Sequence, residues 1–480
     1  MDLFGTAGIR GSVEDRVTPE LALTVGRAVA AEIRDRTDDP TGGDPAAPAS
    51  EVVLARDGRV SGAAIAAAME SGLAAGGVDV RRAGQLPTPG LAYASRGRYG
   101  VMLTASHNPP TDNGIKCFRD GVEFSDELEA AIESRVADEP TRAPWDEWTE
   151  ADRIEPLAGY LRAVRDYAET FGADLDGLRI AVDCGNGMAA PATPRVLREL
   201  GATVVTLNGN VDGHFPGRGS KPTPETLRDL RAFVADANED VTESGRSTAD
   251  GDAEGFAFGI GHDGDADRIV IVDDDGEVVH EDTVLAVLAE AYVRRSGADD
   301  PVVVTTPNAS GRIDERVRAA GGRVDRVRLG ALHEGIARVE RDGNTVAFAA
   351  EPWKHVHVPF GGWIDGVCSA AVIARLVADD GLAALREPVT ERPYRKVSVA
   401  CPDDRKGPAM TQLETTLPEA FPDADVDTDH GVRLEFPDAS WTLVRPSGTE
   451  AYVRIYAESD AVDDLVANVR GVVEDAIEGV

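Results

Sequence analysis

The sequence predicts a multidomain α/β protein, with three similar mixed α/β domains in series and a smaller α+β domain at the C-terminal end. Three observations lead to this fold class: a βαβ pattern that occurs three times, a different C-terminal pattern, and a length of 480 residues. At about 100–150 residues per domain, such a chain is expected to form several domains.

The repeated pattern covers residues 52–80, 178–207 and 301–327. Each copy has an apolar run, a polar turn, an amphipathic segment of about three to four helical turns, a glycine and a second apolar run. This is the pattern of a βαβ unit, which predicts mixed or mostly parallel sheets. The spacing is too large and irregular for a solenoid.

The C-terminal segment differs from these repeats. Residues 432–459 contain two runs of alternating apolar and polar residues joined by a turn-rich loop, and a helix is expected over 460–477. Candidate linkers lie at 138–152 and 386–393, and acidic surface loops are expected near 36–50 and 236–253. The predicted domains are therefore 1–152, 153–277, 278–385 and 386–480.

The composition is strongly acidic, with a formal net charge of −36. Because such a surface repels phosphate backbones, we expect no nucleic-acid partner. Only five of the 49 basic residues are lysines, which leaves 44 arginines. A lysine-poor acidic surface suits concentrated salt, where self-repulsion is screened, so we hypothesise a halophilic source. Aromatic residues make up 5% of the chain, so cores of Ala, Val, Leu and Ile are expected.

The four cysteines are scattered and form no CxxC pair, which argues against a disulfide framework or a thiolate zinc site. No segment approaches the ~20 apolar residues of a membrane span, and the first residues lack a secretory-signal pattern. We therefore expect a cytoplasmic protein with no membrane partner.

A first loop with chemical content is TASHNPPTDNGIKCF, residues 104–118. Ser106 follows the apolar run 101–103 and precedes His107. A serine is a poor nucleophile unless it is activated, and this one lies outside a G-x-S-x-G elbow with its histidine directly adjacent. The alternatives are an ordinary strand-to-loop exit, a hydrolase nucleophile, and a serine that carries a phosphoryl group.

A second loop, GHDGDADRIVIV, alternates Asp263, Asp265 and Asp267 with small residues. An extended segment would bring the three carboxylates to one side, where a cation must neutralise them. Oxygen-only ligands suit Mg²⁺. An EF-hand fits poorly, because its positions six and twelve hold Arg268 and Asp274. An acidic turn between strands is the other alternative.

Two further loops could bind a phosphorylated sugar. In RPSGTE, residues 445–450, Arg445, Ser447, Gly448 and Thr449 offer a guanidinium, hydroxyls and backbone N–H groups for an oxyanion, although a plain hairpin turn is also consistent. Residues 349–366 hold several groups that suit sugar hydroxyls: Glu351, Trp353, Lys354 and His355. A metal site at His355 and His357 lacks an evident third ligand.

The charges of the first two loops must be balanced by further cations. A phosphoserine and three aspartates with one Mg²⁺ leave a net charge of about −3. At an effective dielectric near 20, unit charges 4 Å apart interact by about 4 kcal/mol. The candidate cations are Lys116, Arg268 and Arg10.

Four segments in order, FGTAGIRG (4–11), TASHNPP (104–110), DGDADR (263–268) and RPSGTE (445–450), resemble the α-D-phosphohexomutase family. That family includes phosphoglucomutases, phosphomannomutases and phosphoglucosamine mutases, and this chain resembles a haloarchaeal member. The resemblance spans nearly the whole chain and implies four domains around a central cleft. It implies an isomerase that interconverts hexose 1-phosphate and hexose 6-phosphate of glucosamine, mannose or glucose.

The resemblance also implies residue roles. Ser106 would carry the phosphoryl group and, with Asp263, Asp265 and Asp267, hold one Mg²⁺. A hexose 1,6-bisphosphate would be the intermediate and the activator. His107 would support the phosphoserine, and Lys116 would act as general acid/base or contact a phosphate. Arg10 and Arg268 would contact the transferring phosphate. The sugar would be bound by Glu351, Lys354 and His355, and the distant phosphate by Arg445, Ser447, Gly448 and Thr449.

One segment departs from the family. Many members have Glu-x-Ser-Gly-His at the sugar-binding loop, whereas Trp353 and Lys354 replace Ser-Gly here. This leaves the sugar open. The competing functions are a metal-dependent sugar phosphatase, for which no second metal site with histidine ligands is found, and a non-catalytic sugar-phosphate binder. Small sugar phosphates are the expected partners of a monomer or homodimer.

Overall fold

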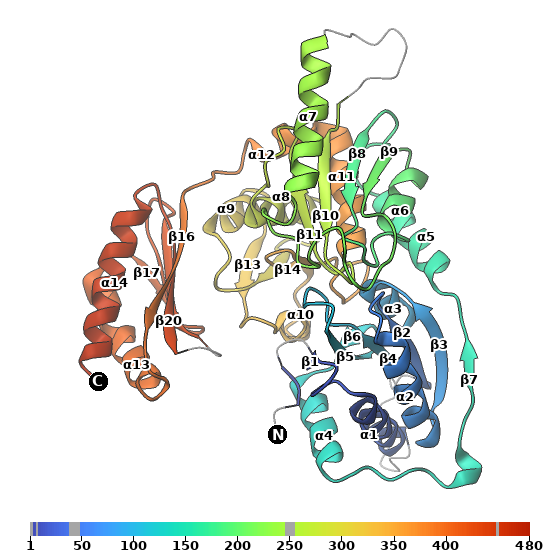
Figure 1. Ribbon diagram of the computed structural model, residues 1–480. Coiled ribbons are helices and arrows are strands. Elements are labelled where there is room, and N and C mark those ends of the chain that lie inside the picture. The colour runs from blue at the N-terminus through green and yellow to red at the C-terminus, as the bar shows by residue number, and fades with distance from the viewer. Residues whose placement is uncertain (1–2, 6–7, 38–48, 245–254, 448–450) are drawn as a thin grey trace. The chain divides into compact units, whose positions relative to one another are not determined.

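The computed structural model describes residues 3–5, 8–37, 49–244, 255–447 and 451–480 and forms two compact units (Figure 1). The first unit consists of Met1–Val279 and Trp353–Leu385, and the second of His280–Pro352 and Arg386–Val480. Within the described ranges, no helix combines the length and the apolar character needed to cross a bilayer. The multidomain mixed α/β fold predicted from the repeats is confirmed.

The first sheet of the first unit has seven strands in the order β1-β5-β4-β2-β3-β7, with β6 beside β5. Its strands are β1 Ile9–Ser12, β2 Ala49–Arg56, β3 Asp79–Gln85, β4 Arg98–Leu103, β5 Asp112–Arg119, β6 Val122–Glu123 and β7 Ala151–Arg153. Its helices are α1 Pro19–Thr37, α2 Gly62–Ala75, α3 Thr88–Ala94 and α4 Asp126–Ala137. Strands β2, β3 and β4 are parallel, whereas β5 runs antiparallel to β4. The βαβ unit predicted over 52–80 is thus confirmed.

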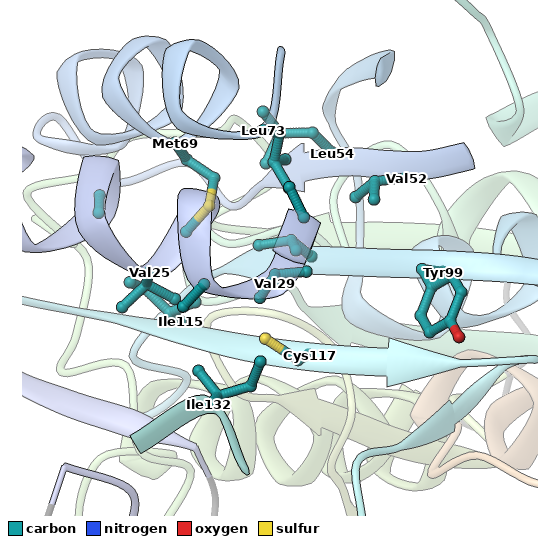
Figure 2. Packing of buried hydrophobic residues seen from close by; sticks show 14 of the residues in the cluster. Val25, Val29, Val52, Leu54, Met69, Leu73, Tyr99, Ile115, Cys117 and Ile132 are labelled. Atoms are coloured by element: carbon teal, nitrogen blue, oxygen red, sulfur yellow. The ribbon is translucent and has the colours of Figure 1, made fainter. Parts of the chain in front are cut away.

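Helices α1 and α2 cover one face of this sheet and enclose its core. Figure 2 shows Val25 and Val29 of α1, and Met69 and Leu73 of α2, packed over strand residues including Ile115. All five side chains are at most 1% exposed, and each contributes roughly 1.5–3 kcal/mol by burial. This packing holds the ends of β2, β4 and β5 in place.

The two helices meet backbone to backbone at a pair of glycines. A Cβ added at Gly72 would lie 2.3 Å from the carbonyl oxygen of Leu23, and one at Gly26 would lie 2.6 Å from that of Met69. Any side chain there would push the helices apart, so these positions require glycine.

The second sheet of the first unit has the order β11-β10-β8-β9. Its strands are β8 Arg179–Asp183, β9 Thr203–Leu207, β10 Phe258–His262 and β11 Ile269–Val272, and its helices are α5 Leu157–Ala168, α6 Thr193–Glu199, α7 Arg228–Ser244 and α11 Gly366–Asp380. Strand β8 is parallel to β9 and β10, and β11 is antiparallel to β10. The short strand β15, Lys354–Val356, also belongs to this unit.

In the second unit, strands β12 Val302–Thr305, β13 Arg323–Arg326 and β14 Val346–Glu351 are parallel. They are accompanied by α8 Glu281–Arg295, α9 Gly311–Ala319 and α10 Leu332–Arg341. The C-terminal sheet is antiparallel in the order β16-β20-β19-β18-β17. It comprises β16 Tyr394–Ala400, β17 Asp425–Asp427, β18 Val432–Glu435, β19 Trp441–Pro446 and β20 Tyr452–Glu458, with α13 Asp403–Ala420 and α14 Val462–Glu478.

Several local predictions were wrong in detail. Helix α6 has 7 residues and α9 has 9, shorter than three to four turns. In α6 the reason is Pro194, which is tolerated only in the first turn because it lacks an N–H and clashes with a preceding turn, so the helix cannot begin much earlier. Residues 432–459, where two alternating runs were predicted, contain three strands, and Ala439, whose φ is 63°, lies between the first two. Residues 236–244 lie in α7 instead of a loop, while 38–48 and 245–253 lie outside the described residues.

Two segments show that the chain does not pass simply from one domain to the next. The segment 138–152 contains a short 3₁₀ helix, Trp145–Glu147, and the start of β7, which pairs with β3. Helix α11 packs against α5 and α6 in the first unit, so the chain returns to that unit after β14.

Candidate active site

Ser106 lies in the turn between β4 and the antiparallel β5, at one end of the parallel strands of the first sheet. It is buried and has a φ of 50°, in the left-handed region. A non-glycine residue in that region costs about 1–2 kcal/mol, so surrounding contacts must maintain it. One such contact is the bond from the Ser106 N–H to Thr104 Oγ1, at 2.9 Å.

The Ser106 hydroxyl points at the second sheet. Its Oγ donates to Asp263 Oδ2 at 2.6 Å and lies 3.4 Å from His107 Nδ1. Asp263 follows β10, so the fold joins two loops that lie 157 residues apart. This contact unites the first two loops that the sequence singled out.

The three aspartates between β10 and β11 are buried and converge as predicted. One carboxylate oxygen from each of Asp263, Asp265 and Asp267 lies within 4.8 Å of the others. The turn that brings them together includes Ala266 in the left-handed region, with φ 62°. The Oδ1 atoms of Asp265 and Asp267 are buried without a hydrogen-bond partner in the described structure. Converging, partly unsatisfied carboxylates fit a hard divalent cation such as Mg²⁺.

The three carboxylates do not titrate alike. Burial, together with the neighbouring Asp267 and Asp265 charges, raises the pKa of Asp263 well above its ordinary value. Burial also opposes ionisation of Asp267, but Lys116, Arg268 and Lys354 outweigh it and lower the pKa of this carboxyl. Negative charge therefore accumulates on the side of the site nearest these cations.

Lys116 supplies a cation from β5, where it lies opposite Met102 of β4. Its Nζ donates to Asp267 Oδ2 at 3.1 Å and lies 3.5 Å from Glu123 Oε1 and 4.0 Å from Asp265 Oδ2. Burial alone would lower the pKa of Lys116, but these three carboxylates raise it. The lysine is therefore a buried ammonium set among carboxylates.

Arg268 and Arg10 add positive charge around Ser106. The Nε of Arg268 lies 3.7 Å from Asp267 Oδ1 and 3.9 Å from Asp263 Oδ2, and it has no hydrogen-bond partner in the described structure. Arg10 lies on β1, opposite Gly114. Burial, followed by the charges of Arg268 and Arg10, lowers the pKa of His107 to about 3, so this imidazole is neutral.

The predicted sugar-binding residues are divided between the units. Glu351 ends β14 in the second unit and accepts a hydrogen bond from the Gly330 N–H at 2.6 Å. Lys354 begins β15 in the first unit and forms a β-bridge with Arg268. The chain between them passes through Trp353, whose φ is 68° and whose ring packs against an apolar cluster of the second sheet.

His355 and His357 share one partner, the Ser369 hydroxyl, at 3.0 Å from His355 Nδ1 and 2.8 Å from His357 Nε2. Both rings are buried, and burial lowers each pKa to about 3. Ser369 in turn donates to the Asp365 carbonyl at 2.8 Å. These contacts orient the start of α11.

Arg445 and Ser447 lie in the second unit, near the end of β19. Arg445 is opposite Arg454 of β20, which places both side chains on one face of the sheet. The carbonyl of Ser447 accepts from Lys406 Nζ at 2.8 Å, and its Oγ is buried without a hydrogen-bond partner in the described structure. Gly448 and Thr449 lie outside the described residues.

Several residues that shape the site were missed in the sequence. Thr88, the first residue of α3, donates through Oγ1 to Asp265 Oδ2 at 2.7 Å. His262 lies 2.8 Å through Nδ1 from the carbonyl oxygen of Arg268, which closes the aspartate loop. Arg218 donates to the His262 carbonyl at 2.6 Å and to Asp183 Oδ2 at 2.8 Å.

Asp57 and Arg59 were also missed, although a signal for them exists. They follow β2, which is parallel to β4, and parallel neighbours end at the same edge of a sheet. The position of the DGR segment near Ser106 could therefore have been predicted from parallel β2 and β4, although its contacts could not.

Comparison with known proteins agrees with this geometry. Three family models match: Phosphoglucomutase/phosphomannomutase alpha/beta/alpha domain I over residues 1–143, alpha/beta/alpha domain II over 158–276, and the C-terminal domain over 397–476. A protein named "Phosphopentomutase" from Thermococcus kodakarensis is 39% identical over 470 residues, covering 96% of this chain and 94% of the relative.

Two further proteins align over nearly their full length. One named "Probable phosphoglucosamine mutase" from Methanopyrus kandleri is 39% identical over 492 residues, covering 99% of each chain. A crystal structure of a phosphoglucomutase/phosphomannomutase family protein from Burkholderia thailandensis superimposes with a TM-score of 0.80 at 25% identity, covering 99% of this chain and 97% of the other. The chain therefore belongs to the phosphoglucomutase/phosphomannomutase family. These are the α-D-phosphohexomutases, which its four sequence motifs resemble.

Proposed function

We propose that this protein is a sugar-phosphate mutase that moves a phosphoryl group between the two ends of a sugar through a phosphorylated Ser106. The observation that carries the proposal is the contact between Ser106 Oγ and Asp263 Oδ2, at 2.6 Å, in a buried cluster of three aspartates. A serine at a cation-binding carboxylate cluster suits phosphoryl transfer, where catalysis consists mainly of positioning and charge stabilisation.

In the proposed reaction, the bond between phosphorus and Ser106 Oγ breaks while a bond to a sugar hydroxyl oxygen forms. The neutral His107 is the side chain that would take the proton of that hydroxyl, whereas the protonated Lys116 would donate a hydrogen bond to the phosphoryl group. The bisphosphorylated sugar then returns its other phosphoryl group to Ser106. The net result is isomerisation, with no water consumed and no phosphate released.

Charge compensation comes from both the chain and a cation. Asp263, Asp265 and Asp267 would hold Mg²⁺ together with Ser106, and the bound ion would neutralise the carboxylates and the transferring phosphoryl group. Arg268 has a buried Nε without a partner in the described structure, which suits a contact with a phosphoryl oxygen. Arg10 of β1, opposite Gly114 of β5, would add positive charge near His107.

The distant phosphate would be bound by Arg445, Ser447, Gly448 and Thr449, and the sugar hydroxyls by Glu351, Lys354 and His355. The unsatisfied Ser447 Oγ and the paired Arg445 and Arg454 are consistent with an anion there. Binding energy gained at the non-reacting end can be used to orient the reacting end.

The sugar is the open part of the proposal. Trp353 and Lys354 stand where many family members have Ser-Gly, and one relative is named a phosphopentomutase while another is named a phosphoglucosamine mutase. We therefore propose a substrate range that includes glucosamine, mannose or glucose phosphates and extends to pentose phosphates. We also propose that the protein works in a salt-rich cytoplasm. The proposed domains are 1–152, 153–277, 278–385 and 386–480.

The test is phosphorus NMR in multimolar KCl with Mg²⁺ and a trace of glucose 1,6-bisphosphate. Glucose, mannose, glucosamine and ribose 1-phosphates are supplied separately. The expected result is a 6-phosphate, or a 5-phosphate from ribose, without inorganic phosphate. Inorganic phosphate without isomerisation would indicate a phosphatase, and no change with any sugar would favour a non-catalytic binder.

A further inference from the structure

Arg59 is an arginine with no exposed side-chain surface that lies beneath the Ser106 loop. It follows β2, and its guanidinium donates to several main-chain carbonyls of the turn between β4 and β5. These are the carbonyls of Ser106 at 2.9 Å, Asn108 at 2.8 Å, Pro109 at 2.5 Å and Asp112 at 2.9 Å. One side chain thus holds the turn along most of its length.

Asp57 completes the arrangement. Arg59 donates through Nε to Asp57 Oδ2 at 3.0 Å, and its own main-chain N–H donates to Asp57 Oδ1 at 2.9 Å. The Thr104 hydroxyl also donates to Asp57 Oδ2, at 2.8 Å, and Thr104 accepts the Ser106 N–H. Ser106 is therefore held on its carbonyl side by Arg59 and on its N–H side through Thr104.

The bonding pattern separates Arg59 from the phosphate-binding cations. A guanidinium has five N–H donors, and all five of Arg59 are engaged, one with Asp57 and four with carbonyls. No donor remains for a substrate phosphate. A lysine could not replace this planar fork, because its ammonium has three donors at a single point.

Ser106 needs such support because its left-handed φ of 50° is unfavourable for a residue with a side chain. In a less restrained turn the chain would relax toward ordinary backbone angles and carry Oγ away from Asp263. We infer that Arg59, balanced by Asp57, is a positioning residue that holds Ser106 in the conformation needed for phosphoryl transfer. This inference rests on the proposed function of Ser106.

The main test compares Arg59→Met with Arg375→Met. Arg375 is also buried and also secures a loop of the first unit, donating to the carbonyl of Phe171 at 2.9 Å and to Asp174 Oδ1 at 2.6 Å. None of its hydrogen bonds in the described part of the chain reaches the Ser106 turn. Both variants lose a buried arginine, so the comparison separates a general loss of stability from a specific loss of positioning.

We expect Arg59→Met to speed amide hydrogen exchange in residues 104–112 by about tenfold or more. With the sugar phosphate that the wild type converts, kcat should fall by about 30-fold or more while KM stays within about threefold. Arg59→Lys should give an intermediate kcat. Arg375→Met should leave both kcat and exchange in this turn near wild type, even though its thermal midpoint falls.

Wild-type exchange in this turn and a wild-type kcat in Arg59→Met would overturn the inference. If Arg59→Met does not fold, Thr104→Val decides, because it removes the link to the Ser106 N–H and the bond to Asp57 but keeps Arg59 in place. Faster exchange and about a tenfold lower kcat at unchanged KM support the inference, and unchanged values overturn it. If the wild type converts no sugar phosphate, the proposed function fails, and the exchange comparison alone decides whether Arg59 restrains the turn.

Discussion

Gly264 lies between two of the clustered aspartates, and a methyl group there would strike the Ser106 turn. A Cβ built on Gly264 lies 2.6 Å from the Ser106 carbonyl oxygen, whereas ordinary contact begins at 3.4 Å. In Gly264→Ala, one main chain must therefore retreat by about 0.8 Å. The carbonyl cannot move freely, because Arg59 holds it at 2.9 Å.

The size of the effect follows from this displacement. Overpacking of a rigid site costs about 1–3 kcal/mol, so the thermal midpoint should fall slightly. A misplacement near 1 Å between reacting groups can cost about 100-fold in rate. Since the aspartates and Ser106 would move apart, we expect kcat to fall by about 10- to 100-fold with little change in KM.

The assay is initial-rate kinetics on the converted sugar phosphate at saturating Mg²⁺, with thermal unfolding measured in parallel. Gly159→Ala is the matched control: it lies within α5 of the same unit, and a Cβ there meets nothing within 4 Å. That change should leave kcat unaltered and stabilise the helix by up to about 1 kcal/mol. A kcat for Gly264→Ala within about twofold of wild type would refute the reasoning.

Three other predictions concern the phosphoryl carrier, the cation and a buried acid. Ser106→Ala should abolish mutase turnover with an unchanged circular dichroism spectrum, and substantial residual turnover with bisphosphate present would contradict the carrier role. Asp265→Asn should lower both the apparent Mg²⁺ affinity and the rate, and a chelator should lower the thermal midpoint of the wild type more than that of this variant; equal shifts would argue against the cation site. In the second unit, burial followed by the charge of Glu281 raises the pKa of Asp282 from 3.8 to about 8. The folded protein therefore binds more protons than the unfolded chain between about pH 4 and pH 8, so this carboxyl makes wild-type stability fall as pH rises through that range. Asp282→Asn should exceed the wild type in thermal midpoint by more at pH 8 than at pH 5, and an equal difference at both pH values would contradict the pKa shift.

Elements whose signal is local were predicted well. The strands β2 and β3 with the intervening α2, and the final helix α14, agree with the hydrophobic pattern of the sequence. Errors arose where a local rule or a long-range contact overrode that pattern, as at Pro194 in α6 and in the unexpected pairing of β7 with β3. The hydrophobic periodicity of a segment identifies its apolar face, but it does not determine which other strand or helix pairs with that segment.

The site was predicted in part for a similar reason. Ser106 and the three aspartates stand in short segments whose spacing is itself informative, so they could be identified without coordinates. The contacts of Arg59 could not be predicted, because they are made to main-chain carbonyls about 50 residues away, and every residue type has a carbonyl. Thr88 reaches Asp265 across 177 residues and resembles any other residue at the start of a helix.

The sequence by itself determined the α/β class, the repeated βαβ units, the acidic lysine-poor character and the chemical content of the four loops. These follow from residue type and near-neighbour spacing. Only the tertiary structure decided that Ser106 Oγ meets Asp263, that Lys116 lies among carboxylates, and that Asp57 and Arg59 hold the serine in a left-handed conformation. The physical reason is that these contacts form when strand order brings distant loops to one sheet edge, and strand order depends on the packing of the whole unit.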